Sequence, residues 1–329
     1  MIKKYNESFR NAWDDFIDNQ SINGNFLQSR RFLSYHGDRF VDHSLLFYKG
    51  ERIVAVLPAC LSEDGRVLNS HAGATFGGLI PGAVFASITN YDEILDELLN
   101  YMKEQKIEEI VLKMPSKLYS RRDTSIDVLE YMLRNRGFAV AEEVGFYLPL
   151  IDLADDFESN FSVLRKRKYK KSLKAGLSFR RLETVADIER FYGVLLDNYV
   201  KFGTAPVHNL DEILLLYNKC IPNEIAFYGV FHGSNMVAGS MVFDFCHRKT
   251  FHTQYLASSQ NSLDLCPNEF LYTSLKKKKK KIGYRYLSFG TTTLEHGKIF
   301  NHGLAIYKEG YGTQSYINRT YTYKQGGLD

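Results

Sequence analysis

The sequence predicts an α+β protein of two domains, each with a mixed and mostly antiparallel sheet flanked by helices. Its 329 residues exceed what one ordinary hydrophobic core accommodates, and 44% hydrophobic with 24% charged residues is typical of a globular protein. Predicted strands follow one another through hairpins, and a helix precedes the last strand of each half. This order differs from the strict strand–helix alternation of a Rossmann fold.

A β-hairpin is predicted early in each half of the chain. SLLFYKGERIVAVLPACL has Lys49 and Gly50 at its turn, and AFYGVFHGSNMVAGSMVFDF repeats the pattern with Gly233 at the turn. A further strand follows each hairpin, in RVLNSHAGATFGGL and in TFHTQYLASS. Each of these strands leads to an irregular loop, so the two halves share their first three elements.

The helix and the final strand of each half also correspond. The helices are YDEILDELLNYMKEQ and NEFLYTSLKKKKKK, and the strands that follow them are EEIVLKM and YRYLSFG. Glu93 and Glu269 are 176 positions apart, as are Ile110 and Tyr286, while the two hairpin glycines are 183 apart. Such similar offsets across hairpin, helix and strand indicate an internal duplication.

The boundary between the domains is predicted near residues 150–156. There YLPLIDLADDFESNF passes from a strand into a new helix, whose N-cap we expect at Asp155 or Asp156. We therefore expect a first domain over residues 1–152 and a second over residues 153–329. Apolar residues at helical spacing in ETVADIERFYGVLLDNYVKF predict another helix in the second domain.

Targeting and cysteine patterns favour a cytoplasmic protein. MIKKYNESFRNAWDDF lacks the apolar segment of a signal peptide, and no apolar run approaches the length of a membrane span. The acidic Asp14 and Asp15 argue against a transit peptide. The four cysteines show no ligand-like spacing, so we expect buried, reduced thiols and no metal.

Positive charge is concentrated in two runs. Seven basic residues occupy the ten positions 165–174 in LRKRKYKKSLKAGL, and residues 276–281 are six consecutive lysines. Of the 42 Lys and Arg, these thirteen leave 29 against 38 Asp and Glu elsewhere in the chain. Because a nucleic-acid-binding protein usually spreads positive charge over a face, this pattern favours a local phosphate or carboxylate site, and DNA is not an expected partner.

Four motifs occur in order in the second half: the basic helix ending in KAGL, then HTQYLASS, GYRYLSFG and NHGLAIYKEGYG. Together they resemble the GNAT acyltransferase superfamily, and within it the double-domain FemAB-like branch, which includes peptidoglycan-bridge aminoacyl transferases and BioF2-like acyltransferases. The resemblance implies two tandem GNAT-like domains. It further implies an N-acyltransferase of cell-wall or surface-polysaccharide assembly (cell envelope biosynthesis), with the donor site in the second domain and the acceptor in a cleft between domains.

The sequence departs from that family at the donor site. Single-domain GNAT enzymes hold the CoA diphosphate with a glycine-rich turn, whereas SSQNSLDLCPNEF has no glycine at this position. A helix N-terminus can still bind phosphate, and Pro267 suits its first position, so Ser259, Asn268 and Glu269 are the donor-binding candidates for acyl-CoA as co-substrate. Glu269 has a plainer interpretation as a first-turn acid that favours the helix dipole. The absence of a long charged helical hairpin makes aminoacyl-tRNA the less favoured donor.

Acyl transfer to an amine needs a group that stabilises the developing oxyanion and a route for the amine proton. The resemblance makes Lys308 the stabilising cation, with Tyr307 beside it; the alternative is a surface lysine at a strand–loop junction. Further candidates lie on the strand that lines the acyl site in relatives and in TTTLEHGK. They are His252 and Gln254 on one predicted face, Tyr255 on the other as proton relay or packed tyrosine, and the loop residues Glu295 and His296 as acid or base.

The basic helix has three interpretations: a solvated face, a nucleic-acid contact such as tRNA, or a clamp for the diphosphate of a carrier-linked acceptor. The clamp is favoured because residues spaced by three form one positive stripe that repels itself without an anionic partner. Its residues are Arg165, Lys168, Lys171 and Lys174, with Arg167 beside them. The lysine run is interpreted as an ordinary helix with some stems directed towards the sheet, and weak attraction to an anionic membrane surface or tRNA is the alternative. HAGATFGGLIPG is expected to form a tight turn or a wall of the acceptor groove, and Ser288 replaces an Asp usual in the family.

Two rival functions remain open at this point. One is an aminoacyl-tRNA-dependent peptidoglycan-bridge transferase, which would show steeply salt-dependent tRNA binding. The other is a GNAT-like scaffold that has lost catalysis and only binds a ligand. The sequence favours the N-acyltransferase over both.

Overall fold

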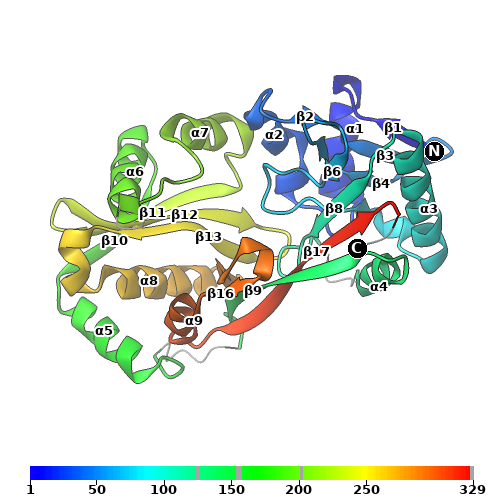
Figure 1. Ribbon diagram of the computed structural model, residues 1–329. Helices are drawn as coiled ribbons and strands as arrows, with labels where there is room; N and C mark the ends of the chain where they lie inside the picture. The colour runs from blue at the N-terminus through cyan, green and yellow to red at the C-terminus, as the bar shows by residue number, and fades with distance from the viewer. Residues whose placement is uncertain (123–125, 153–157, 201–202, 327–329) are drawn as a thin grey trace. The chain divides into compact units, whose positions relative to one another are not determined.

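The computed structural model describes residues 1–122, 126–152, 158–200 and 203–326 (Figure 1). The chain forms two compact units, one of Met1–Glu143 with Ile317–Asp329 and the other of Val144–Tyr316. The predicted boundary between residues 152 and 153 adjoins residues 153–157, which lie outside the described residues. The predicted N-caps Asp155 and Asp156 fall within that segment. The structure divides the chain nine residues earlier and returns its last strand to the first unit.

Strand pairing explains this division. Residues Val144–Pro149 of β9 (Ala139–Pro149) belong to the second unit, where they pair antiparallel with β14 (Tyr286–Thr291). Conversely, β17 (Gln314–Lys324) follows the second half in sequence but pairs antiparallel with β8 (Glu109–Met114) of the first unit. Such pairings join residues more than a hundred positions apart, and local sequence patterns do not report them.

Within its described residues the first unit has two sets of strands and four α-helices. One antiparallel sheet has the order β1-β3-β4-β7, formed by Ile2–Lys4, Leu45–Lys49, Arg52–Leu57 and Ile80–Pro81. Beyond β17 and β8 the other set continues with β6 (Val67–Asn69), β5 (Cys60–Leu61) and β2 (Val41–Asp42). The helices are α1 (Arg10–Asp15), α2 (Arg30–Leu33), α3 (Ile88–Glu104) and α4 (Asp127–Asn135). Shorter 3-10 or π turns cover Glu7–Phe9, Phe16–Gln20, Phe26–Gln28, Ser34–His36 and Ala83–Phe85.

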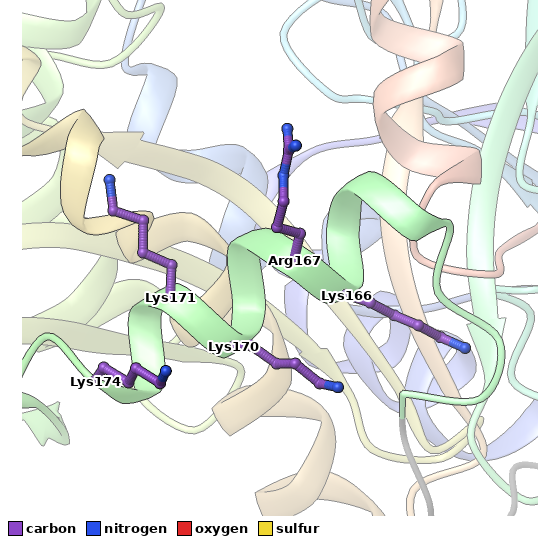
Figure 2. A pocket seen from close by; sticks show the side chains of 5 residues that line it. All are labelled: Lys166, Arg167, Lys170, Lys171 and Lys174. Carbon is purple, nitrogen blue, oxygen red and sulfur yellow. The ribbon is translucent and has the colours of Figure 1, made fainter.

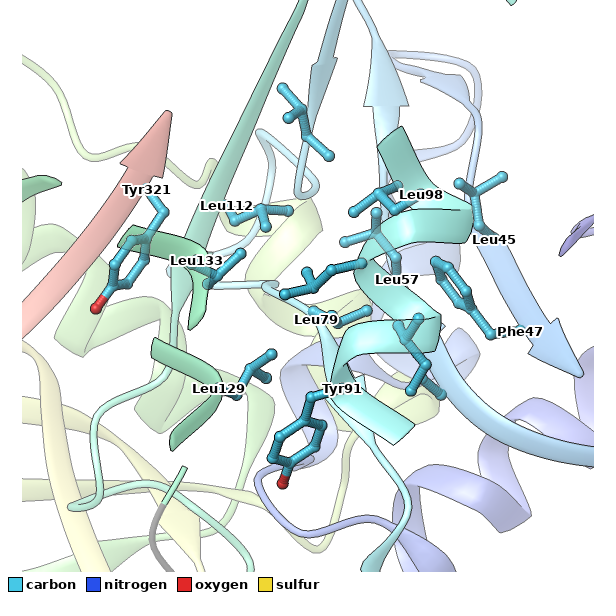
Figure 3. Packing of buried hydrophobic residues seen from close by; sticks show 14 of the residues in the cluster. Leu45, Phe47, Leu57, Leu79, Tyr91, Leu98, Leu112, Leu129, Leu133 and Tyr321 are labelled. Atoms are coloured by element: carbon cyan, nitrogen blue, oxygen red, sulfur yellow. The ribbon is translucent and has the colours of Figure 1, made fainter. Parts of the chain in front are cut away.

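The core of the first unit forms around α3 (Figure 3). The helix begins after Ser87, whose hydroxyl accepts a hydrogen bond from the backbone N–H of Asn90. Its buried side chains recur at helical spacing and include Tyr91, Leu95 and Leu98. Each buried leucine of this kind stabilises the fold by about 1.5–3 kcal/mol relative to an exposed one.

The main sheet of the second unit has helices on both faces. Its strands run in the order β10-β11-β12-β13-β14-β9, with β10 (Leu177–Leu182), β11 (Ile225–His232), β12 (Asn235–Phe245) and β13 (Thr250–Ser258). The helices are α5 (Val163–Leu173), α6 (Val185–Val200), α7 (Leu210–Leu215), α8 (Pro267–Lys281) and α9 (His302–Glu309). A small hairpin joins β15 (Thr293–Leu294) to β16 (Ile299–Phe300), and short turns cover Leu216–Cys220, Gln260–Leu265 and Glu295–Gly297. Figure 1 shows α6 and α7 on one face of this sheet and α8 on the other.

The predicted order of elements is confirmed in both units. Gly50 and Gly233 lie at the two hairpin turns with φ of +63° and +58°, a conformation that glycine adopts without strain. The helix of each predicted repeat, α3 or α8, connects a parallel pair of strands, β6 with β8 and β13 with β14. One minor prediction was wrong: Cys60 and Cys266 are buried, but Cys246 is exposed. Within the described ranges no helix has the length and apolarity needed to cross a membrane.

Candidate functional site

The candidate site lies where β13 and β14 stop pairing. Their parallel pairing covers only Thr250–His252 and Tyr286–Ser288, although β13 continues to residue 258 and β14 to residue 291. Both strands are also irregular here. β13 has a bulge opposite residues 241–242 of β12, and β14 has one between Ser288 and Gly290. Beyond these points the two backbones no longer bond to each other, so their polar groups need other partners.

Lys308 supplies such partners at the end of β14. Its Nζ donates hydrogen bonds to the carbonyl oxygens of Gly290, at 2.9 Å, and Thr291, at 2.7 Å. The side chain is 5% exposed, and burial lowers the pKa of Lys308 to about 7. The predicted alternative of a surface lysine is therefore wrong: Lys308 is buried and lies on α9. With two N–H groups of the ammonium engaged, the third can face a ligand.

His252 lies against the same bend. Its Nδ1 is 3.0 Å from Ser288 Oγ, which also accepts a hydrogen bond from the N–H of Gly290. A Cβ placed on Gly290 would stand 3.3 Å from His252 Cε1, and Gly290 has a φ of +72°. Burial and then the charge of Lys308 lower the pKa of His252 to about 3, so the ring is neutral near pH 7. The hydroxyl of Ser288 thus links His252 to the bend.

Tyr255 has a different partner from the Lys308 cluster. Its hydroxyl is 2.8 Å from His208 Nδ1 and accepts a hydrogen bond from the His208 backbone N–H at 3.3 Å. Gln254 hydrogen-bonds to His252, as expected for two side chains on one face. The predicted opposite placing of Tyr255 was wrong, because the β13 bulge interrupts the alternation. Phe251 contacts Lys279 of α8, so the next residue, His252, faces the opposite side of the sheet. Tyr255 meets His208 on that side, where Tyr192 of α6 also contacts His208.

Arg165 is buried rather than presented to solvent. Its guanidinium forms a buried ion pair with Glu269 and stacks on Tyr307, 4.1 Å from the ring centre, and on Tyr311, at 5.1 Å. Arg165 therefore joins α5, α8 and α9, and its burial separates it from the positive stripe predicted with Lys168, Lys171 and Lys174. Tyr307 directly precedes Lys308, so this cluster helps to fix the helix that carries the buried ammonium. Burial also raises the pKa of Tyr307 to about 12.

The expected donor-binding segment has an unexpected structure. A 3-10 turn, Gln260–Leu265, follows Ser259, and the N–H of Gln260 donates to Asp197 Oδ2. Asn268 Nδ2 donates to Ser258 Oγ. Glu269 places a carboxylate in the first turn of α8, where Arg165 balances its charge. The carboxylate therefore occupies the helix end that would otherwise attract phosphate.

Glu295 and His296 lie at the exposed tip of the β15–β16 hairpin. Both have positive φ, +49° and +55°. In the described parts of the chain no hydrogen bond or ion pair joins either of them to Lys308 or His252.

The remaining cations of α5 surround an open hollow of about 480 Å³ (Figure 2). Its lining residues are Lys166, Arg167, Lys170, Lys171 and Lys174. Lys168 is half-buried and does not line it. On α8, by contrast, Lys276 and Lys279 are buried, with Lys279 Nζ 3.6 Å from the Phe251 ring centre. The interpretation of the lysine run as a helix that directs some stems towards the sheet is confirmed.

Sequence reasoning missed a second hollow, of about 310 Å³, in the first unit. Its polar lining includes Arg30, Asp42, His36 and His71. Arg30 is buried, pairs with Asp42 and stacks 3.4 Å above the Tyr5 ring. His71, the first residue of HAGATFGGLIPG, has a φ of +38°, and burial lowers its pKa to about 4. His71 lies 41 positions after Arg30 in the sequence, so only the fold reveals the hollow.

Known proteins with the same fold were found by structure alone. Neither a protein-family model nor a curated protein sequence matches the chain. FemX superposes with a TM-score of 0.68 at 12% identity, covering 98% of this chain and 97% of that chain. L-PGS from Bacillus licheniformis gives 0.60 at 11%, covering 98% and 92%, and a tandem GNAT protein from the clavulanic acid biosynthesis pathway gives 0.53 at 9%, covering 100% and 99%. Among the described residues no three His, Cys, Asp or Glu side chains are grouped to hold a metal ion.

Proposed function

We propose that this chain, which has the GNAT-like, FemAB-like double-domain fold, is an N-acyltransferase of cell-wall or surface-polysaccharide assembly. It transfers an acyl group from acyl-CoA, or a similarly activated donor, to the amine of an amino sugar or amino-acid acceptor. The observation that carries this proposal is the buried ammonium of Lys308, held by two carbonyls where β13 and β14 part. The place of the acceptor in a cleft between domains stays a prediction.

In the proposed reaction, the acceptor amine attacks the carbonyl carbon of the thioester. A carbon–nitrogen bond forms, and the carbonyl electron pair moves to oxygen. The third N–H of Lys308 donates a hydrogen bond to this oxyanion. This hydrogen bond stabilises the oxyanion more in a buried site than it would in water. The carbon–sulfur bond then breaks, and the amine proton passes to the departing thiolate. No covalent intermediate with the enzyme is required.

His252 is proposed to position groups rather than to act as the base. A base works best when its pKa is close to the working pH, and a pKa of about 3 leaves His252 neutral but weakly basic. Its hydrogen bond to Ser288, and that of Ser288 to the N–H of Gly290, instead support the bend that presents two carbonyls to Lys308. The neutral ring also leaves the ammonium as the only positive charge within this cluster of three side chains.

One structural observation supports aminoacyl-tRNA as the alternative donor. The 3-10 turn before α8 and the carboxylate of Glu269 in its first turn weaken the case for a CoA diphosphate at this helix end. An ester-linked aminoacyl group would use the same Lys308 without needing that diphosphate site. Acyl-CoA and charged tRNA therefore have to be tested side by side as donors.

The deciding experiment combines a donor panel with a matched pair of lysine variants. Purified protein is given acyl-CoA thioesters or aminoacyl-tRNA with amino sugars and amino-acid conjugates, and the acylated product is measured by mass spectrometry. Lys308→Met should lower kcat/KM about 100-fold or more, as loss of an oxyanion-stabilising donor does. Lys298→Met, at an exposed lysine of the β15–β16 hairpin, should leave the rate unchanged.

Two results would count against the proposal. Full activity of the Lys308→Met variant would remove Lys308 from the chemistry. Consumption of no donor with any acceptor would favour a ligand-binding scaffold without catalysis. Product from charged tRNA alone would replace the acyl-CoA donor with the aminoacyl donor while keeping the site.

A further inference from the structure

We propose that α5 docks this protein onto an anionic membrane surface. The helix has two faces with different tasks. Arg165, Tyr169 and Ser172 point inward and are buried, and Lys277 Nζ donates to the Tyr169 hydroxyl at 3.1 Å. Together with the Arg165–Glu269 pair, these contacts hold α5 against α8 and leave the opposite face preformed and turned to solvent.

The outward face combines cations with exposed aliphatic side chains. Val163 is 86% exposed, Leu173 51% and Leu164 45%, which is unusual on so charged a helix. Four of the five cations that line the hollow of about 480 Å³ lie between these residues in the sequence, and the fifth, Lys174, directly follows Leu173. A basic helix with aliphatic residues on its solvent side is typical of segments that lie in the membrane interface, where chains enter the lipid boundary and ammonium groups meet headgroups.

The charge of this face has no counterpart in the described chain. α5 contains no acidic residue, and none of the five lining cations forms an ion pair with a described carboxylate. Like charges at helical spacing repel one another, so the face is most stable beside a separate anionic body. Each Lys or Arg near an anionic leaflet contributes about 1 kcal/mol of attraction.

The directions of the side chains fit a surface better than a single phosphate. In Figure 2, Arg167 and Lys171 extend from one side of the helix, whereas Lys166 and Lys170 extend from another. A clamp for one diphosphate would need these groups to converge on a point. Divergent cations can each meet a different headgroup of a lipid layer.

The same face is poorly suited to RNA. Proteins that bind single-stranded RNA stack bases on exposed aromatic rings, and Tyr169, the only aromatic residue of α5, is buried. Four of the five lining cations are lysines, which act as point charges rather than bidentate ligands. The exposed aliphatic residues would stay in water against a phosphate backbone but become buried in a lipid interface.

The first turn of α5 extends this surface towards α9. Ser162 N donates to the carbonyl of Gly310 at 2.9 Å, so the start of α5 meets the end of α9. Ile306, one turn before Gly310, is 68% exposed. Apolar side chains therefore flank the joint between the cationic helix and the helix that carries Lys308.

Vesicle sedimentation with the full chain tests the proposal without relying on any enzymatic activity. Protein is mixed with vesicles of phosphatidylcholine alone or of equal parts phosphatidylcholine and phosphatidylglycerol. We expect binding to the anionic vesicles only, weakened by added salt. A triple variant, Lys170→Gln, Lys171→Gln and Lys174→Gln, should bind about 100-fold more weakly, from about 1 kcal/mol for each charge. A control triple at the exposed Lys103, Lys106 and Lys219 removes the same charge elsewhere and should bind like wild type.

A fluorescent reporter locates the contact. The chain has one tryptophan, Trp13, which is fully buried and gives a constant background. Val163→Trp should show quenching by brominated anionic lipids, whereas Val84→Trp, at an equally exposed valine of the first unit, should not. Quenching at both positions or at neither would contradict docking through α5.

Competition separates lipid from the other anions. Inorganic phosphate or tRNA, added at equal charge, should leave vesicle binding largely intact. Equal loss of vesicle binding by both triple variants, or no binding of wild type to anionic vesicles, would overturn the proposal. Binding of tRNA through α5, with no binding of vesicles, would assign the helix to nucleic acid instead. Because no activity is measured, failure here leaves the proposed acyl transfer untouched.

Discussion

Lys308 and Gly290 are joined by a 2.9 Å hydrogen bond from the ammonium to the backbone carbonyl, although they lie on different elements 18 residues apart. The carbonyl is available because β14 leaves β13 just before this point. A single side chain thus satisfies the frayed end of a strand and places a positive charge beside it. Lys308 thus has a structural role at the end of β14 and a proposed role in the chemistry, and experiments can test the two roles separately.

The pH profile of the reaction should report the charge of Lys308. Because burial lowers the pKa of Lys308 to about 7, the ammonium form is lost as pH rises through that value, and kcat/KM should fall. Lys308→Arg keeps a positive charge at all accessible pH values and should lose this falling limb, at a lower overall rate. A wild-type profile retained unchanged in the arginine variant would assign the limb to another group.

Stability should depend on pH through the same group, with a defined sign. The folded chain releases the Lys308 proton near pH 7, whereas the unfolded chain holds it to about 10.5. The unfolded state therefore binds more protons between these values, and the free energy of unfolding of wild type should rise with pH relative to Lys308→Met. Urea denaturation of both proteins at pH 7 and pH 9 measures the difference. A constant difference would contradict a lowered pKa.

The Arg165–Glu269 pair should be strongly coupled. Glu269→Gln leaves a buried guanidinium without its carboxylate, which costs about 3–5 kcal/mol of unfolding free energy. Combining it with Arg165→Met should recover part of that loss, because the unpaired charge is removed. The exposed Lys49–Glu93 pair is the control, and breaking it should cost less than about 1 kcal/mol. Equal costs for the two pairs in chemical denaturation would show that burial is unimportant here.

Gly290→Ala should damage activity more than stability alone explains. Both Gly290 and Gly233 have positive φ, so alanine at either costs about 1–2 kcal/mol. Only at Gly290 would the new methyl group press on His252, whereas the position at Gly233 has no neighbour within 4 Å. We expect a large fall in kcat/KM for the first variant and none for the second, measured at a temperature where both are folded. Equal activities would exclude the bend from the site.

The basic helix shows what residue spacing can and cannot predict about the burial of side chains. A spacing of three places Arg165, Lys168 and Lys171 on one stripe, and the sequence alone offers no reason to separate them. In the structure Arg165 turns inward because Glu269, 104 positions later, supplies a buried partner and two tyrosine rings cover the guanidinium. The bulge in β13 likewise defeats simple alternation, because its position depends on the neighbouring strand β12.

The amino-acid sequence by itself determined the order of elements, the two glycine turns and the duplicated pattern, because these follow from local propensity and periodicity. The tertiary structure alone decided which unit receives the last strand, where β13 and β14 separate, and which cations are buried. Those outcomes depend on partners distant in the sequence, in part more than a hundred residues away, on desolvation and on packing, and none of these is expressed in the spacing of neighbouring residues.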